Sequence, residues 1–304
     1  MFKNCVFAAV LVAFLASCAG AAEVAEKVEK VEKVEKKGIL LVAFGTSMPE
    51  ATGAIESLVS AAKSAFPDTE VRLAYTSNII RRKLKKERGI EIPTPPEALA
   101  RMNDERFSRV YVQPMHVIPG EEYDDLKSVV DAFASMKGKY GFPHIALGQP
   151  FLSNESDCEL MAGILARHLA GQGKFESNKA VVLMGHGTPH MANAMYSAMQ
   201  GALSRLSDPA VSGRIFLGTV ESTPTFDDVL AALKKTRVKS LVLAPFMIVA
   251  GDHANNDLAG ADDPESWLSL FKKEGYEVEP YLVGLGQYPE IAKLFVKRIE
   301  ELVE

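Results

Sequence analysis

The sequence is poor in cysteine and tryptophan and has no surplus of basic residues. Its 304 residues include three cysteines and one tryptophan, and 34 Lys and Arg stand against 39 Asp and Glu. Proteins that bind nucleic acid concentrate Lys and Arg on one surface, so the net charge of -5 argues against that partner class. Cys5 and Cys18 lie near the N-terminus, which leaves Cys158 as the one cysteine of a processed chain. The fold must therefore be stabilised by packing, and we expect Cys158 in the core.

The sequence also lacks an apolar run long enough to cross a bilayer in a mature chain. The run at residues 5–16 follows Lys3 and precedes small residues at 17–22, which is the pattern of a secretory signal peptide. We therefore expect residues 1–22 to be removed and the protein to be exported to the periplasm, with no transmembrane helix in its mature form. An alternative is a lipid anchor through Cys18, because residues 15–18 also resemble a lipobox. Residues 23–37 repeat Val-Glu-Lys and are predicted to form a charged spacer.

Short apolar runs alternate with helical stretches from residue 38 onward. Such runs are typical of parallel strands that are buried on both faces, and the intervening helices would cover the sheet. The pattern predicts an α/β fold with two similar Rossmann-like lobes, each a parallel sheet flanked by helices. The expected strands are residues 39–44, 70–75, 109–112, 144–147, 180–184, 214–217, 241–244 and 278–283.

An internal duplication divides this part of the chain. Residues 112–122 (VQPMHVIPGEE) align with residues 243–253 (LAPFMIVAGDH), and the alignment extends to other strand ends. We take residues 38–176 as an N-terminal lobe and residues 177–304 as a C-terminal lobe that carries the metal site. Ligands of open parallel sheets bind beyond the carboxyl ends of the strands, so the expected site is a cleft between the two lobes.

At three equivalent strand ends, the second lobe carries two histidines and a glutamate where the first lobe carries two threonines and a glutamate. Two imidazoles and a carboxylate suit a borderline divalent ion such as Co²⁺, Fe²⁺, Ni²⁺ or Zn²⁺. Taken alone, each of these residues has a structural alternative, as a hydrogen-bonded histidine or a helix-capping glutamate. Their coincidence at equivalent strand ends favours a metal or catalytic site. At these positions the first lobe carries Thr46, Thr76 and Glu122, and the second lobe carries His186, Glu221 and His253.

At these residues the chain resembles the anaerobic sirohydrochlorin cobaltochelatases of cobalamin synthesis. The resemblance implies the class II chelatase fold, which ferrochelatases share, and a lyase that inserts Co²⁺ into sirohydrochlorin or a related tetrapyrrole, with Fe²⁺ as the second choice. It places His186, Glu221 and His253 at metal-binding positions, with His186 and Glu221 also catalytic. The export signal is a departure, because cobalamin synthesis is expected in the cytoplasm. The similarity is carried by residues 116–123 (HVIPGEEY), 183–187 (LMGHG), 220–224 (VESTP) and 245–257 (PFMIVAGDHANND).

The rest of the expected site binds the tetrapyrrole. Its carboxylates would be bound by basic side chains and by N–H groups at helix N-termini, which indicates Thr46, Ser47 and Arg81. The alternative for Arg81, within the basic stretch 81–86, is an exposed helix face. His116 is expected either to be structural or to be the axial ligand of a haem bound outside the active cleft.

A second class of function stays open at this point. An exported carrier of haem or metal on a chelatase fold would use the same cleft for storage or delivery. The set of His186, Glu221 and His253 favours the enzyme over this carrier. The sequence is also compatible with a homo-oligomer. Among the remaining histidines, His168 fits an exposed helix position without a partner.

Overall fold

A computed structural model describes residues 35–176 and 179–304 of the chain. The expected signal peptide, the lipobox at Cys18 and nearly all of the expected spacer lie outside these residues. The described part from Lys37 to Glu304 groups into a single unit. Within it, no helix combines the length and the apolar composition that crossing a bilayer requires.

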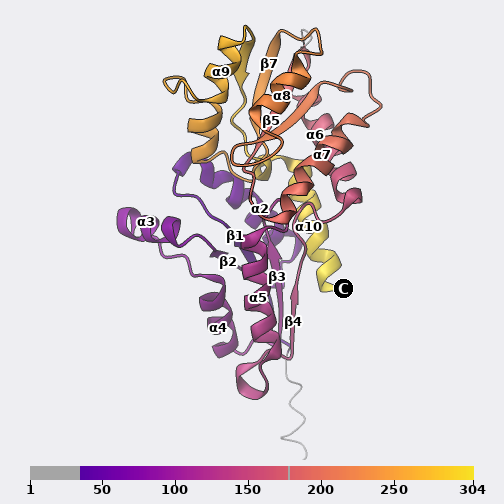
Figure 1. The fold of residues 1–304 in the computed structure, drawn as a ribbon. Helices are drawn as coiled ribbons and strands as arrows, with labels where there is room; N and C mark the ends of the chain where they lie inside the picture. The colour runs from indigo at the N-terminus through magenta and orange to yellow at the C-terminus, as the bar shows by residue number, and fades with distance from the viewer. Residues whose placement is uncertain (1–34, 177–178) are drawn as a thin grey trace, which may run out of the picture. The chain divides into compact units, whose positions relative to one another are not determined.

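Two four-stranded parallel sheets form the framework (Figure 1). The strands are β1 (Lys37–Ala43), β2 (Glu70–Tyr75), β3 (Arg109–Pro114), β4 (His144–Leu147), β5 (Ala180–Gly185), β6 (Ile215–Thr219), β7 (Ser240–Pro245) and β8 (Glu277–Pro280). Their order is β2-β1-β3-β4 in one sheet and β6-β5-β7-β8 in the other. The second order repeats the first, so the predicted α/β fold with two similar lobes is confirmed.

The central strands β1 and β5 are runs of apolar side chains because helices cover both faces of each sheet. In β1, Leu41 faces a hydrophobic core that both sheets share, whereas Leu40 faces a second core that belongs to the first sheet. In β5, Leu183 faces the shared core and Val182 faces a third core that belongs to the second sheet. Successive side chains of a strand point to opposite faces, so burial on both sides requires an unbroken apolar run.

The helices divide into an inner set and two outer sets. Apolar side chains of α2, α6, α7 and α10 pack in the shared core, those of α4 and α5 cover the outer face of the first sheet, and those of α8 and α9 cover the second. The helices are α2 (Thr52–Ala65), α3 (Asn78–Arg88), α4 (Pro95–Asp104), α5 (Glu121–Ser135), α6 (Glu155–Gly171), α7 (Ala194–Ser204), α8 (Phe226–Leu233), α9 (Trp267–Lys273) and α10 (Pro289–Val303).

The last helix of each half packs on the other half. Helix α6 ends the first half and packs against α7, while α10 ends the chain and packs against α2 and β3 (Figure 1). The short 3-10 helix η6 (Leu285–Gln287) leads into α10 and also contacts α2. The contact is close, because a Cβ added at Gly286 would lie 2.6 Å from the backbone oxygen of Ala54. The two halves are therefore interlocked.

Cys158 and His168 are two of the polar side chains of α6 that are buried where the halves meet. Cys158 is fully buried, as predicted, and burial raises the pKa of its thiol to about 11. The expectation of an exposed His168 is wrong, since this residue is only 8% exposed. Its ring stacks on Tyr288 with centroids 3.6 Å apart, Nδ1 lies 3.2 Å from Glu290 Oε2, and Nε2 lies 3.3 Å from Tyr281 Oη. The hydrogen-bond partners are 122 and 113 residues away in sequence, so local patterns give no sign of them.

Gly286→Ala should destabilise the protein, because the added methyl group would press η6 away from the Ala54 carbonyl. We expect the free energy of unfolding to fall by about 1–3 kcal/mol, measured by urea denaturation followed by circular dichroism. Gly53→Ala in α2 is the matched control, since a Cβ there has no neighbour within 4 Å, and alanine favours a helix. Equal stability of Gly286→Ala and the parent would contradict this packing.

Candidate metal centre

Three ligand-type side chains meet at the carboxyl edge of the second sheet. His186 directly follows β5, Glu221 comes two residues after β6, and His253 lies in the turn after β7. Because β5 lies between β6 and β7 in a parallel sheet, the carboxyl ends of these strands share one edge. One ligand atom from each residue lies within 4.8 Å of the other two. The structure thus brings together the three residues predicted to bind metal.

Backbone contacts fix the separation of the His186 and Glu221 loops. The Glu221 N–H donates to the His186 carbonyl at 2.9 Å, which continues the β5–β6 pairing beyond the strands. Gly187 has φ +84°, and a Cβ there would lie 2.8 Å from the Ser222 nitrogen. Only glycine combines this left-handed conformation with so close an approach, so the glycine of the motif serves to bring the two ligand loops into contact.

The two imidazoles are oriented through their Nδ1 atoms. His186 Nδ1 lies 2.8 Å from the Gly187 carbonyl oxygen, and His253 Nδ1 lies 2.7 Å from Asp257 Oδ2. Since these oxygens only accept hydrogen bonds, we assign the proton to Nδ1 in both rings, which leaves Nε2 free to bind metal. The rings meet edge to face with centroids 4.6 Å apart. Glu221 Oε2 lies 3.6 Å from His186 Nδ1.

The centre opens into a cleft of about 860 Å³ whose walls come from both halves of the chain. Pockets of about 300–1,000 Å³ are typical of sites that bind small molecules. The side chains of His186, Glu221 and His253 are 46%, 50% and 34% exposed, so a ligand in the cleft can reach them. Apolar side chains also line the cleft, among them Phe44, Ile79, Phe246 and Ile248.

Two of the residues predicted to bind substrate, Thr46 and Ser47, line this cleft. The Thr46 hydroxyl accepts a hydrogen bond from the Met48 N–H at 3.1 Å, so part of its role is to shape the turn after β1. The Ser47 carbonyl accepts a hydrogen bond from the Arg88 guanidinium at 3.0 Å, which ties this turn to α3.

Arg81, the third predicted substrate residue, does not line the cleft. Its Nε donates to the Ile92 carbonyl at 2.7 Å, and its two terminal nitrogens donate to Asn78 at 2.9 Å and Glu97 at 2.7 Å. These bonds join α3 to the start of α4. The structure therefore gives Arg81 a role in holding α3, and we assign it no contact with substrate.

Lys83 is the residue of the basic stretch that reaches the cleft, and sequence reasoning missed it. Among the described residues it is the one Lys or Arg that lines the cleft. Ile79, Ile80 and Lys83 all line it, and their spacing of three and four residues places them on one face of a helix. This spacing is the sequence signal from which Lys83 could have been predicted to lie on the same helix face as Ile79 and Ile80. The other charged side chains of the lining are acidic, namely Glu121, Glu122, Glu221 and Asp252.

His116 also lines the cleft, from the turn after β3. Both ring nitrogens are buried and have no hydrogen-bond partner among the described residues. Burial lowers the pKa of His116 to about 4, so the ring is neutral at physiological pH. The haem alternative assumed a place outside the active cleft, whereas His116 belongs to the cleft wall.

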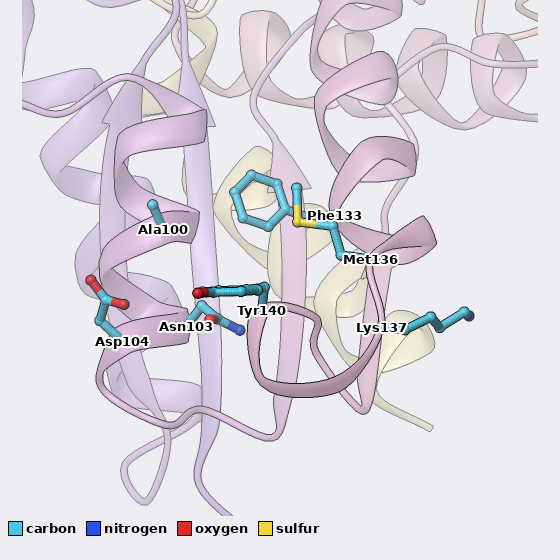
Figure 2. Close-up of a pocket in the computed structure, with 7 residues that line it drawn as sticks. All are labelled: Ala100, Asn103, Asp104, Phe133, Met136, Lys137 and Tyr140. Atoms are coloured by element: carbon cyan, nitrogen blue, oxygen red, sulfur yellow. The ribbon is translucent and has the colours of Figure 1, made fainter.

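A second hollow of about 530 Å³ lies between the ends of α4 and α5 (Figure 2). Helix α5 begins beside the metal cleft at Glu121 and ends at Ser135, so this hollow lies toward the opposite edge of the first sheet. Its walls are largely apolar, with Phe133, Met136 and Tyr140 among them. It contains no group of metal-ligand residues in the described part of the chain, and we assign no chemistry to it.

Fold and centre together define the protein as a class II chelatase. Over residues 37–304 the chain matches the family described as Cobalt chelatase (CbiK), and it belongs to that family. It is 36% identical over 268 residues to the sirohydrochlorin cobaltochelatase CbiKC of Nitratidesulfovibrio vulgaris, covering 88% of this chain and 91% of that one. It is 33% identical over 269 residues to the sirohydrochlorin cobaltochelatase of Salmonella typhimurium, covering 88% and 96%.

Two solved structures share the fold at lower sequence identity. SirB from Bacillus subtilis with Fe³⁺ has a TM-score of 0.58 and 15% identity, covering 88% of this chain and 95% of that one. CbiX, described as the terminal enzyme of siroheme biosynthesis in denitrifying bacteria, has a TM-score of 0.53 and 17% identity, covering 88% and 100%. At these identities the similarity supports the fold alone.

His253→Ala should weaken Co²⁺ binding, because it removes one of the two nitrogen ligands. Loss of a residue that merely orients a ligand already costs about 10–100-fold in metal affinity, so we expect a loss of roughly 100-fold or more. Isothermal titration of Co²⁺ into the protein without tetrapyrrole measures this. His144→Ala removes an exposed imidazole at the start of β4 and should leave affinity unchanged. Parental affinity in His253→Ala would exclude His253 as a ligand.

Proposed function

We propose that this protein inserts Co²⁺ into sirohydrochlorin, a tetrapyrrole rimmed by carboxylates, as a step of cobalamin synthesis. The observation that carries the proposal is the group formed by His186, Glu221 and His253, which opens into a cleft large enough for a macrocycle. Membership of the cobalt chelatase family and the names of the two relatives support the choice of ion and substrate.

Metal insertion requires two exchanges, and the centre has groups for both. The free macrocycle loses two pyrrole N–H protons as the ion enters, and the ion replaces its protein and water ligands with ring nitrogens. His186 and His253 hold Co²⁺ through Nε2, together with Glu221. As the ion leaves, Nε2 of His186 accepts one pyrrole proton, and the second passes to water in the open cleft. Glu221, whose Oε2 lies 3.6 Å from His186 Nδ1, stabilises the resulting imidazolium.

The charge distribution of the cleft orients the substrate. Acidic side chains attract a divalent cation and repel the carboxylates of the tetrapyrrole. The macrocycle therefore places its apolar faces against exposed side chains such as Phe44 and Ile79, with its carboxylates toward the rim. Lys83 is the cation of the lining that can pair with one of them.

Three further elements belong to the proposal. Fe²⁺ is the second ion we propose, since two imidazoles and a carboxylate accept several first-row metals. Export rests on the sequence of residues 1–22 alone. Haem ligation by His116 would require its ring to turn so that a nitrogen becomes accessible. A carrier of metal or haem is the alternative function, and repeated turnover distinguishes the two.

His186→Ala should lose at least about 100-fold in turnover, because proton acceptance and one metal ligand are both removed. The measurement is a spectrophotometric assay of the parent, His186→Ala and His144→Ala with sirohydrochlorin and Co²⁺. The parent and His144→Ala should convert many equivalents of substrate. Binding of a single equivalent without turnover by the parent would reject the enzyme in favour of a carrier. Parental activity in folded His186→Ala would reject the assignment of His186.

Lys83→Glu should raise the KM for the tetrapyrrole about tenfold with little change in kcat. An exposed ion pair contributes up to about 1 kcal/mol, and charge reversal adds a repulsion of similar size. Arg82→Glu is the matched control, because it makes the same charge change on the same helix at a residue that does not line the cleft. Equal effects of the two substitutions would show that only the net charge of α3 matters.

A further inference from the structure

The loop that carries His253 is held by three consecutive side chains that each reach back four positions. Such contacts connect successive turns of a helix and resist rotation of the chain between them. Two of these hydrogen bonds connect parts of the loop to one another, and the third holds the imidazole ring of His253. They are Asn255 Nδ2 to the Gly251 carbonyl at 2.8 Å, Asn256 Nδ2 to Asp252 Oδ1 at 3.0 Å, and Asp257 Oδ2 to His253 Nδ1 at 2.7 Å.

This segment is a single turn of π-helix, η5 (Ala254–Leu258), that begins immediately after His253. Turns of π-helix are rare in proteins, and many of those that occur lie at functional sites. Ala254 and Leu258 are fully buried and anchor the turn in the protein interior. With its two ends fixed in this way, the turn holds Asp257 beside the His253 ring.

We propose that Asp257 is the positioning residue of the metal centre, holding His253 with Nδ1 protonated and Nε2 directed at the incoming Co²⁺. This inference rests on the proposed function and deepens it. A carboxylate behind a ligating imidazole fixes the ring's tautomer and orientation and makes the other nitrogen a stronger donor. The 2.7 Å contact between Asp257 and His253 provides such a pair.

The hydrogen-bond partners of Nδ1 make the two histidines unequal as metal ligands. Nδ1 of His186 hydrogen-bonds the neutral carbonyl of Gly187 at 2.8 Å, and the Glu221 carboxylate lies beyond hydrogen-bond distance at 3.6 Å, whereas Nδ1 of His253 hydrogen-bonds the Asp257 carboxylate at 2.7 Å. A charge-assisted hydrogen bond is roughly twice as strong as a neutral one. His253 therefore anchors Co²⁺ before transfer, and His186 is the ligand that gives up the ion and takes a pyrrole proton.

Two substitutions separate the contributions of charge and hydrogen bonding. Asp257→Ala removes both, and we expect it to raise the Co²⁺ dissociation constant about 10–100-fold. Asp257→Asn keeps an oxygen acceptor without the charge, so its effect should be smaller. In turnover, the KM for Co²⁺ should rise while the KM for sirohydrochlorin stays at the parental value. Asp262→Asn, an exposed position of the following loop, is the control for loss of one negative charge.

Asn255→Ala tests whether the effect is only loosening of the loop. It removes the bonds of Asn255 Nδ2 to the Gly251 and Ala250 carbonyls without touching the His253 ring, so it should weaken Co²⁺ binding less than Asp257→Ala does. Equal losses in these two variants, or parental Co²⁺ affinity in folded Asp257→Ala, would overturn the proposal. Because Co²⁺ titration needs no tetrapyrrole, a parent that binds Co²⁺ but never metallates substrate would reject the chelatase function separately.

Discussion

Parallel pairing of β5 with β6 and β7 is the constraint on which the candidate metal centre depends. It brings the carboxyl ends of three strands to one edge, where the loop after each strand supplies one of the three ligand-type side chains. The strands are covered on both faces and tolerate little change, whereas the loops beyond them are free to carry chemistry. The sheet thus sets the distances among His186, Glu221 and His253, and the loops set their orientation.

The two halves have the same strand order but contribute different side chains to the site. Loops at equivalent strand ends of the first half carry Thr46 in place of His186, and the Thr46 hydroxyl accepts a hydrogen bond from the Met48 N–H. That half provides the opposite wall of the cleft and, through α3, the cation Lys83. In this duplicated fold the ligand-type side chains of the candidate metal centre are therefore gathered in one half of the chain.

Periodicity predicted the strands, which the structure confirms, and the duplication singled out His186, Glu221 and His253, which the structure brings together. Both signals are local in sequence. The sequence could not show that Arg81 lies outside the cleft lining, because this depends on the rotational position of α3, which the bonds of Arg81 to Ile92 and Glu97 determine. His168 was misplaced for a related reason, since its partners come from the far end of the chain. Asp257 had a signal in its four-residue spacing from His253, but that spacing identifies a partner only once the backbone is known to be helical.

The packing of α10 on α2 and β3 has a consequence for the order in which the molecule can assemble. A ribosome makes the chain from the N-terminus, so strands β1 to β4 emerge long before the 15 residues of α10. Until α10 has emerged, part of the apolar surface of the first half has no cover. Early domains of many proteins fold during synthesis, but here the first half completes its core only with a helix made after the whole second sheet. A defect in α10 would therefore also expose apolar surface in the half of the chain that was made first.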